Sequence, residues 1–198
     1  MAYPDVLNRL IEELKKLPGI GSRTAERLAL AISRYSVEDA IELSDSVRNV
    51  ARGLRCCSHC YNTSENDPCA ICSDMTRERD KILVVEGPSD LNAFENAGWR
   101  GLYHVLQGRI DPVEGVLPEH LTVNALRQRA CSDEIAEIVI ATSPDYEGDG
   151  TALILMKELK ETDKTVSRIA RGVPTGRSIE YANSAILSDA LDGRTRVS

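Results

Sequence analysis

Four cysteines near the end of the first third of the chain have a spacing that predicts metal binding. They form two Cys-x-x-Cys pairs, Cys57 with Cys60 and Cys69 with Cys72, and eight residues separate the pairs. Each pair can direct two sulfurs at one point, and two pairs complete a tetrahedral thiolate site for Zn²⁺. Four protein ligands leave no open position for water, so we expect one structural zinc ion per chain. Free thiols or a redox pair are the alternative interpretation.

The other two cysteines are not expected to bind this metal. Cys56 lies beside Cys57, and His59 lies within the first pair, but the regular spacing favours Cys57 as the ligand, with Cys56 as a spectator. Cys131 falls in a predicted helix, where we expect a small buried hydrophobic residue. The surrounding residues 55–75 have no apolar periodicity, so we expect a metal to order them.

A glycine-containing turn near the N-terminus predicts phosphate contacts. The segment LPGIG (residues 17–21) lies between two helical patterns, as in a helix-hairpin-helix motif. Gly19 and Gly21 let the backbone approach a phosphate, and the next helix presents unpaired N–H groups at the positive end of its dipole. Arg23 and Arg27, four residues apart on that helix, can add charge-assisted contacts to neighbouring phosphates. We expect DNA binding without sequence readout; the alternative is a hairpin that serves only packing or a subunit interface.

The same glycines could begin a dinucleotide-binding fingerprint. That motif follows a strand and has a third Gly or Ala at the position where Thr24 stands. Because a helix precedes the glycines here, we exclude this interpretation. Glu26, which lies between the two arginines, weakens their local positive potential.

Carboxylates follow two predicted strands, at the place where the ligand sites of open α/β sheets lie. Glu86 follows the apolar run at residues 82–85. Three further carboxylates follow the run at residues 135–141: Asp145, Glu147 and Asp149. Oxygen ligands of this kind suit Mg²⁺, which in an enzyme would stabilise a phosphoryl transition state. The alternative is a retired site that is kept as a scaffold or as a docking surface.

The N-terminal third of the chain is predicted to be all helix. Residues 5–17 and the residues after Gly21 carry apolar side chains at helical spacing. Ser36, with Asp39 three residues later, resembles a capping box that opens a third helix. Five apolar side chains of that third helix are predicted to face inward: Ala40, Leu43, Val47, Val50 and Leu54.

From Lys81 onward the pattern changes to alternating strands and helices. Short apolar runs predict four strands, at residues 82–85, 103–106, 135–141 and 166–170. Helical patterns lie between them, near residues 91–98, 122–130 and 150–161. This alternation predicts a parallel α/β sheet.

The composition narrows the range of functions. Aromatic residues make up only 4% of the 198 residues, which leaves little for a base-stacking platform. The net charge of −7 argues against a general nucleic-acid coat, but residues 1–79 carry only −1 of it and residues 80–198 carry −6. Any DNA contact should come from local clusters in the first third, or from several subunits together. Without a leader pattern or an apolar stretch of membrane-span length, we expect a soluble cytoplasmic protein.

The hairpin, the four cysteines and the α/β sheet, in this order, resemble the RecR family of recombination mediators along the whole chain. Further matching stretches are EGPSD (86–90), ATSP (141–144), RIARGVP (168–174) and EYA (180–182). Family members usually have Pro and Lys where Ser22 and Arg23 stand here. The resemblance implies a mixed α/β fold in four parts: a helix-hairpin-helix domain (1–53), a four-cysteine zinc module (54–79), a Toprim-like parallel sheet (80–175) and a short C-terminal segment (176–198).

The Toprim resemblance also bears on catalysis. Catalytic Toprim proteins, which include topoisomerases and primases, have a Glu after the first strand and an Asp-x-Asp after a later one. Glu86 matches the Glu, but the Asp-x-Asp falls on Ser-Pro-Asp at residues 143–145, so the first aspartate is missing. Glu147 and Asp149 could replace it only in part. We therefore expect no enzyme and, in the absence of a phosphate loop, no ATPase; a Mg²⁺-dependent Toprim nuclease or topoisomerase-like enzyme is the alternative.

The resemblance further implies a role and partners. It implies a bacterial DNA-repair clamp that forms a ring-like homo-oligomer, expected to be a tetramer, around gapped or single-stranded DNA. RecO-like and RecF-like proteins would act with it to load RecA recombinase. A ring lets an acidic subunit present several copies of Arg23 and Arg27 to DNA. Glu86, Asp145, Glu147 and Asp149 would then form a partner-docking surface or a vestigial Mg²⁺ site. A structural hub without DNA contact is the third hypothesis.

Overall fold

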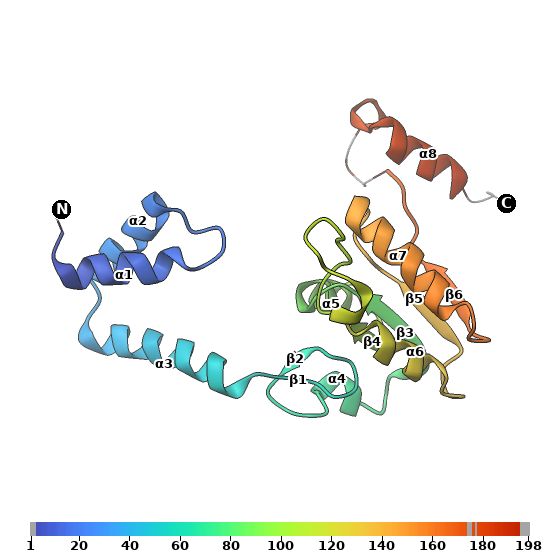
Figure 1. Cartoon of the computed structure of the whole chain (residues 1–198), viewed down its shortest axis with the longest axis horizontal. Coiled ribbons are helices and arrows are strands. Elements are labelled where there is room, and N and C mark those ends of the chain that lie inside the picture. The colour runs from blue at the N-terminus through green and yellow to red at the C-terminus, as the bar shows by residue number, and fades with distance from the viewer. Residues whose placement is uncertain (1–2, 174–175, 177, 195–198) are drawn as a thin grey trace. The chain divides into compact units, whose positions relative to one another are not determined.

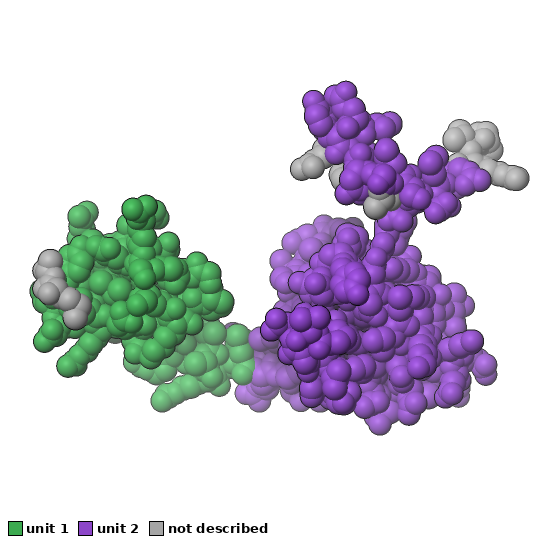
Figure 2. All heavy atoms as spheres, turned by 45° about the horizontal axis from the view of Figure 1, so that its top comes forward, with its two compact units in different colours: residues 1–54 green, residues 55–198 purple. Residues whose placement is uncertain are grey.

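A computed structural model describes residues 3–173, 176 and 178–194 of the chain (Figure 1). The chain divides into two compact units, residues 1–54 and residues 55–198, which are coloured separately in Figure 2. Pro174, the last residue of one of the family-like stretches, lies outside the described residues. None of the described helices is long and apolar enough to cross a membrane.

The first unit consists of three helices, α1 (Asp5–Lys15), α2 (Ser22–Ile32) and α3 (Val37–Gly53). The prediction of an all-helical N-terminal third is confirmed. Helices α1 and α2 pack against each other, and Ala25 and Ala29 of α2 are fully buried. The small side chains on this face of α2 allow the two helices to approach closely. The turn that connects them is therefore held between two packed helices.

Helix α3 begins where the capping pattern predicts. The Ser36 side chain accepts a hydrogen bond of 3.0 Å from the backbone N–H of Asp39, which satisfies one of the free donors of the first turn. The prediction that the apolar residues of α3 face inward is wrong, because no residue of α3 is buried. Val47 is 63% exposed and Val50 is 59% exposed. The amphipathic pattern is real, but α1 and α2 already use their apolar faces on each other and leave little to cover α3.

The second unit begins with the four-cysteine segment. It contains the antiparallel pair β1 (Arg55–Cys56) and β2 (Thr63–Ser64), followed by the one-turn helix α4 (Ala70–Ser73). These elements are too short to bury a core of their own. The segment from 55 to 75 is called the cysteine module below.

A four-stranded parallel sheet follows, as predicted. Its strands are β3 (Glu78–Val85), β4 (Gly101–Val105), β5 (Glu137–Ile140) and β6 (Thr165–Arg168), in the order β4-β3-β5-β6. Val84 of the central strand β3 lies between His104 of β4 and Ile140 of β5. The carboxyl ends of these strands therefore meet at one edge of the sheet, which is where parallel sheets place ligand sites.

Helices cover both faces of this sheet, as in Figure 1. They are α5 (Pro88–Asn96), α6 (Val123–Ala130) and α7 (Tyr146–Leu159). Alternate residues of β3 point to opposite faces. Ile82 and Val84 pack in the core with α6 and α7, whereas Leu83 and Val85 pack with Leu91 of α5.

Two features of this unit differ from the sequence prediction. Helix α7 begins at Tyr146, not at residue 150, and the Asp145 side chain caps it by accepting a hydrogen bond of 2.8 Å from the N–H of Gly148. The glycines at 148 and 150 weaken the helical pattern in the sequence, so this start was missed. The C-terminal segment also forms a helix that was not predicted, α8 (Ser184–Asp192). Short 3₁₀ turns occur at Pro118–His120 and Ile179–Tyr181.

Candidate metal centre, strand-end carboxylates and helical hairpin

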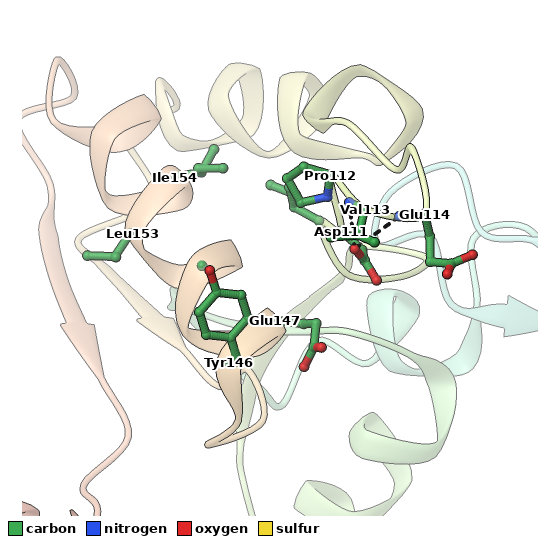
Figure 3. Close-up of a pocket in the computed structure, with 10 residues that line it drawn as sticks. Asp111, Pro112, Val113, Glu114, Tyr146, Glu147, Leu153 and Ile154 are labelled. Atoms are coloured by element: carbon green, nitrogen blue, oxygen red, sulfur yellow. Dashed lines mark hydrogen bonds between the residues drawn. The ribbon is translucent and has the colours of Figure 1, made fainter.

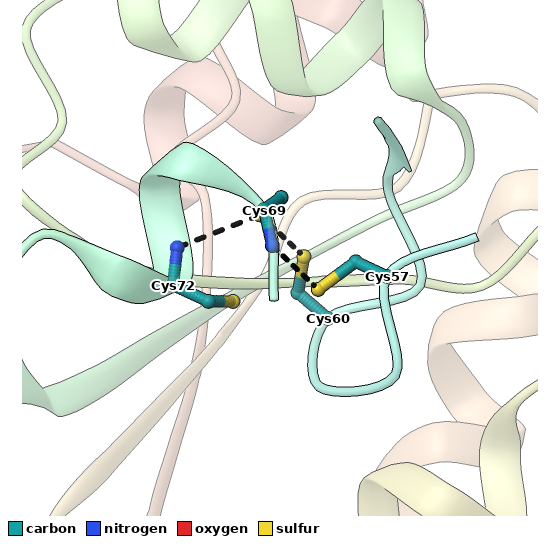
Figure 4. A group of neighbouring side chains, drawn as sticks. All are labelled: Cys57, Cys60, Cys69 and Cys72. Atoms are coloured by element: carbon teal, nitrogen blue, oxygen red, sulfur yellow. Dashed lines mark hydrogen bonds between the residues drawn. The ribbon is translucent and has the colours of Figure 1, made fainter. Parts of the chain in front are cut away.

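The four cysteines predicted to bind zinc lie together in one buried cluster. Cys57 and Cys60 come from the loop after β1, Cys69 is the N-cap of α4, and Cys72 lies in α4 (Figure 4). Their sulfurs all lie within 4.8 Å of one another, and the Cys60 and Cys69 sulfurs are 3.5 Å apart. Each is at most 6% exposed. Four convergent sulfurs with no access for water could hold a metal ion in a closed tetrahedral site.

Backbone N–H groups and burial act in opposite directions on the cysteine thiols. Burial raises the pKa of Cys57, but backbone N–H groups, including those of Cys60 and Cys69, outweigh it and lower that pKa to about 7. The hydrogen bond between Cys60 and Cys72, together with burial, raises the pKa of Cys60 strongly. Burial also raises the pKa of Cys69 to about 11. Without a cation, the cluster therefore resists carrying four thiolates, and a metal would supply the missing positive charge.

The cysteine module is attached to the sheet through β4. The Val105 backbone N–H donates a hydrogen bond of 2.8 Å to the Cys60 carbonyl. The rings of Tyr61 and His104 lie 5.3 Å apart, centroid to centroid, in a tilted arrangement. Within the module, the Asp67 carboxylate accepts bonds of 2.8 Å from both the N–H and the hydroxyl of Ser58, which ties the two cysteine loops together.

The remaining two cysteines lie outside the cluster. Cys56 is exposed, and its sulfur has only long contacts of 4.0 Å, to the Cys57 carbonyl and the Gln107 amide. The prediction that Cys131 is a buried hydrophobic residue is wrong. Cys131 is exposed at the C-terminal end of α6, where its thiol donates to the Arg127 carbonyl at 3.4 Å. Because α6 ends at Ala130, Cys131 no longer follows the buried face of that helix.

The carboxylates of Glu86 and Asp145 lie at neighbouring strand ends and share an arginine. The Arg109 guanidinium is 2.6 Å from Asp145 and 3.6 Å from Glu86. Glu86 also accepts bonds of 2.8 Å from the Ser143 N–H and 3.0 Å from its hydroxyl. The Gly148 N–H, and after it Arg109, hold the pKa of Asp145 below its usual range. A positive side chain and two neutral donors thus occupy the surroundings in which Mg²⁺ would need to bind.

The other two predicted acidic residues point elsewhere. Asp149 pairs with Arg168 at 2.6 Å and with Arg171, so its charge is compensated on the β6 side of α7. Glu147 lies on the opposite side of the helix start, beside the loop that contains Asp111. Both Glu147 and Asp149 lie within α7, and side chains two positions apart on a helix point in different directions. Among the described residues, a group of three or more possible metal ligands close enough to share an ion is found at the four cysteines and not at the carboxylates.

The helical hairpin has the open geometry that phosphate binding needs. Gly19 has a φ of +77°, which favours glycine, and a side chain at Gly19 or Gly21 would meet no other atom within 4 Å. The first N–H groups of any helix lack intrahelical partners, and in α2 no side chain caps them, because the N-cap is Gly21. Arg23 and Arg27 are exposed and form no ion pair within the described part of the chain.

Glu26, between these arginines, is engaged elsewhere. Its carboxylate accepts a hydrogen bond from the Tyr3 hydroxyl, which also raises the pKa of Tyr3. The acidic residue therefore does not pair with Arg23 or Arg27 within the first unit.

Arg109 and Ser143 were not identified as site residues from the sequence. Arg109 follows the end of β4, so the rule that places sites at carboxyl ends of parallel strands could have indicated it. Ser143 was noted only as a missing aspartate. In the structure it donates two hydrogen bonds to Glu86, where an aspartate would repel that carboxylate.

Two family models match this chain. A Toprim domain matches residues 80–170, and the helix-hairpin-helix of RecR matches residues 7–51. Together with the cysteine cluster, these matches define a Toprim protein that carries an N-terminal helix-hairpin-helix.

Relatives that match over nearly their full length give the family. One from Rhodopirellula baltica is 44% identical over 196 residues, and the match covers 98% of each chain. One from Koribacter versatilis is 45% identical over 193 residues, with 97% of each chain covered. One from Lactococcus lactis subsp. cremoris is 43% identical over 198 residues, with 100% of each covered. Each is named recombination protein RecR. The chain belongs to the RecR family, which confirms both the resemblance and the mixed α/β fold class.

Proposed function

We propose that this protein is a non-catalytic, DNA-binding recombination mediator in DNA repair. In this role it acts with RecO-like and RecF-like proteins to help load RecA recombinase onto gapped or single-stranded DNA. The observation that favours this role over an enzyme is the position of Arg109 between Glu86 and Asp145. The names of the relatives support the recombination role.

The absence of turnover can be tested directly. Purified, metal-loaded protein is incubated with supercoiled and gapped DNA and Mg²⁺, and nicking and relaxation are scored. The proposal expects neither. Turnover that Glu86→Ala and Asp145→Ala abolish would establish the alternative, a Mg²⁺-dependent nuclease or topoisomerase-like enzyme.

DNA contact is assigned to Gly19, Gly21, Arg23 and Arg27. The free N–H groups of α2 and the two exposed arginines support this assignment. Binding to gapped duplex is measured over a salt series for wild type and for Arg23→Ala/Arg27→Ala. We expect weaker binding and a salt slope reduced by about 2, since each lost phosphate contact removes about 0.9. The double variant Arg48→Ala/Arg52→Ala, with the same spacing on α3, is the control. An unchanged slope in the first pair would favour a structural hub without DNA contact.

The metal of the cysteine cluster is proposed to be one structural Zn²⁺ per chain, held by Cys57, Cys60, Cys69 and Cys72. The buried four-sulfur donor set supports zinc over oxygen-seeking cations. Metal analysis of the purified protein should give one zinc per chain. Cys60→Ser should lose it, whereas Cys56→Ser and Cys131→Ser should retain it.

A groove next to Glu147 is proposed to dock a protein partner. The start of α7 and the loop 110–114 line it (Figure 3). Val113 is 91% exposed and Tyr146 is 89% exposed, and both lie among the carboxylates of Glu147, Asp111 and Glu114. Exposed apolar side chains within an acidic rim suit a partner surface that is apolar and basic.

The assignment is tested with Glu147→Arg, which reverses the charge at the groove. We expect binding to the RecO-like partner to weaken at least tenfold in a pull-down or titration. Glu161→Arg, exposed beyond the other end of α7, serves as the control. Equal binding by both variants would remove the groove from the docking surface.

The protein is also proposed to form a homo-oligomeric ring, expected to be a tetramer. The uncovered apolar face of α3 supports association between copies, because the first unit alone leaves it exposed. Light scattering should give a smaller mass for Val47→Asp/Val50→Asp than for wild type. Ser46→Asp/Asn49→Asp adds the same charge to the same helix and should keep the wild-type mass. A wild-type mass in both variants would exclude α3 as the contact.

A further inference from the structure

Two arginines of the second unit, Arg129 and Arg79, lie beside the cysteine cluster and have no carboxylate partner in the described part of the chain. Arg129 lies in the last turn of α6, and its guanidinium donates a hydrogen bond of 2.5 Å to the Tyr103 carbonyl of β4. Arg79 of β3 donates to the Cys72 carbonyl at 3.5 Å. Within the described residues, neither arginine forms an ion pair with Asp or Glu. Both are partly buried, so their charges need compensation from another source.

The cysteine sulfurs lie close enough to Arg129 to act on its pKa. Burial lowers the pKa of Arg129, and the charges of Cys72, Cys60 and Cys57 act against that effect. Arg79 lies close enough to lower the same pKa further. Ser58, His59 and Tyr61, which lie within or beside the first Cys-x-x-Cys pair, line one pocket with Arg129. The guanidinium therefore lies where the cysteine module meets α6 and the outer side of β4.

The charges of such a site balance if zinc is bound. Zn²⁺ with four thiolates carries a net charge of about −2, and burying that charge is unfavourable unless positive groups lie close by. Two guanidinium groups supply +2. Without the metal, the thiols would be mostly neutral, and the two arginines would lack a counter-charge.

We propose that Arg129, assisted by Arg79, is the counter-charge of the four-thiolate metal centre and thereby fixes the cysteine module to the sheet. The inference rests on the proposed zinc. Arg129 binds no metal and is a positioning residue: one end of its fork bonds to Tyr103, while its charge stabilises the thiolates. Metal binding and docking of the module then stabilise each other, because coupling between two such equilibria is reciprocal.

The test measures metal release from the full-length zinc protein to the coloured chelator 4-(2-pyridylazo)resorcinol at neutral pH. Arg129→Met keeps much of the side-chain volume and removes the charge. We expect zinc release about tenfold faster than in wild type, which is typical of losing a partner of a metal ligand. Arg129→Lys, which keeps the charge, should stay within about threefold of wild type. Arg127→Met, on the exposed face of the same helix, is the matched control and should not change the rate.

A spectroscopic readout separates charge from packing. In the cobalt-substituted protein, loss of a nearby positive charge should shift the thiolate-to-cobalt charge-transfer band of Arg129→Met to lower energy. Arg127→Met should leave the band unshifted. If Arg129→Met does not fold, Arg79→Met carries the same two measurements, with a smaller acceleration and a shift in the same direction.

The outcomes distinguish this inference from the proposed zinc site. Wild-type protein that neither contains nor binds zinc overturns both. Suppose that the wild-type protein contains one zinc per chain, and that Arg129→Met releases zinc at the wild-type rate with an unshifted band. This result overturns the role of Arg129 and leaves the zinc site standing. Release from Arg129→Lys as fast as from Arg129→Met would assign the effect to the hydrogen-bond geometry and would also overturn the counter-charge role.

Discussion

The guanidinium of Arg109 lies between the carboxylates of Glu86 and Asp145, which follow strands β3 and β5. In a Toprim enzyme, carboxylates at these positions would bind a metal ion. Asp145 is bonded to Arg109 directly, and Glu86 is bonded mainly to Ser143. A bidentate, permanently charged side chain can bring two carboxylates together, but it cannot polarise a phosphate as a divalent ion does. This arrangement supports the proposed non-catalytic role of the second unit.

Removing Arg109 should uncover a weak cation site. Arg109→Ala leaves Glu86 and Asp145 without their shared positive partner, so we expect millimolar binding of Mn²⁺, measured by electron paramagnetic resonance. Wild type and the Arg127→Ala control should bind no Mn²⁺ there. Equal Mn²⁺ binding in all three proteins would show that Arg109 does not block the site.

His104 makes the stability of the second unit depend on pH. It is fully buried in β4, and its Nε2 lies 2.9 Å from the Thr122 hydroxyl. Burial, with a smaller contribution from Arg129, lowers the pKa of His104 from 6.5 to about 3. Because the folded-state pKa lies below the unfolded value, the unfolded chain takes up this proton first as the pH falls.

The stability that neutral His104 provides is therefore complete above about pH 6.5 and is lost as the pH falls towards 3. His104→Gln keeps a donor to Thr122 and cannot titrate. We expect the difference in unfolding free energy between wild type and His104→Gln to shrink by about 2 kcal/mol from pH 7 to pH 5. Urea unfolding at both pH values measures it. A constant difference would mean that His104 keeps an ordinary pKa in the folded protein.

The start of helix α7 depends on one close backbone approach. A Cβ at Gly148 would lie 2.1 Å from the Ser143 carbonyl oxygen, whereas a Cβ at Gly150 would meet nothing within 4 Å. The loop that holds Ser143 against Glu86 is therefore packed directly on the first turn of α7. Position 148 requires glycine because a larger side chain would clash with the Ser143 backbone, and not because of an unusual backbone conformation.

Alanine substitutions at these two glycines should have opposite effects. We expect Gly148→Ala to lower the free energy of unfolding by about 2–3 kcal/mol, because backbone must move to admit the methyl group. Gly150→Ala should raise it by about 0.5–1 kcal/mol through better helix propensity. Thermal unfolding of the metal-loaded variants measures both. A neutral Gly148→Ala would show that the Ser143 loop moves freely relative to α7.

The elements that the sequence predicted are those whose pattern depends on local periodicity. The strands predicted at residues 82–85 and 103–106 correspond to β3 and β4, and α3 begins where its cap was predicted, because each of these elements follows from neighbouring residues. The start of α7 was missed because its two glycines weaken the helical pattern, and the contact that requires Gly148 is with a segment outside the helix. The inward face of α3 was predicted wrongly because periodicity indicates an apolar face but not what covers it.

The same division applies to the sites. The four cysteines were predicted together because two short spacings define them. The link from Arg109 to Asp145 joins residues 36 positions apart, and no local pattern contains it. Likewise, the approach of Arg129 to the cysteine module depends on how α6 packs beside β4. Such pairings follow from the tertiary fold alone.

At the scale of the molecule, the charge is divided between the two units. Residues 1–54 contain eight basic and eight acidic residues, so the net charge of −7 belongs to residues 55–198. A neutral unit carries the hairpin, and an acidic unit carries the groove beside Glu147. The proposed basic partner would therefore be attracted to the second unit, whereas the proposed DNA contact of the first unit would depend on its local arginines and not on net charge.

Metal removal should affect the two units differently. In the full-length protein, we expect chelation to raise amide hydrogen exchange at least tenfold in residues 55–75 and in β4, whose Val105 N–H bonds to Cys60. The helices α1 and α2 should keep their exchange rates. Hydrogen exchange with mass spectrometry gives both values, and added zinc should reverse the change. Equal increases in both units would mean that the chain unfolds as a single cooperative body.

The bond between Val105 and Cys60 has a further consequence, because β4 is an outer strand of the sheet. Unpaired backbone groups on an outer strand are a template for pairing with other extended chains. The cysteine loop and Arg129 occupy such groups on Val105 and Tyr103. If the cluster holds the proposed metal, its loss would expose the backbone groups of β4, and this edge of the sheet would then pair with extended segments of other chains and promote aggregation.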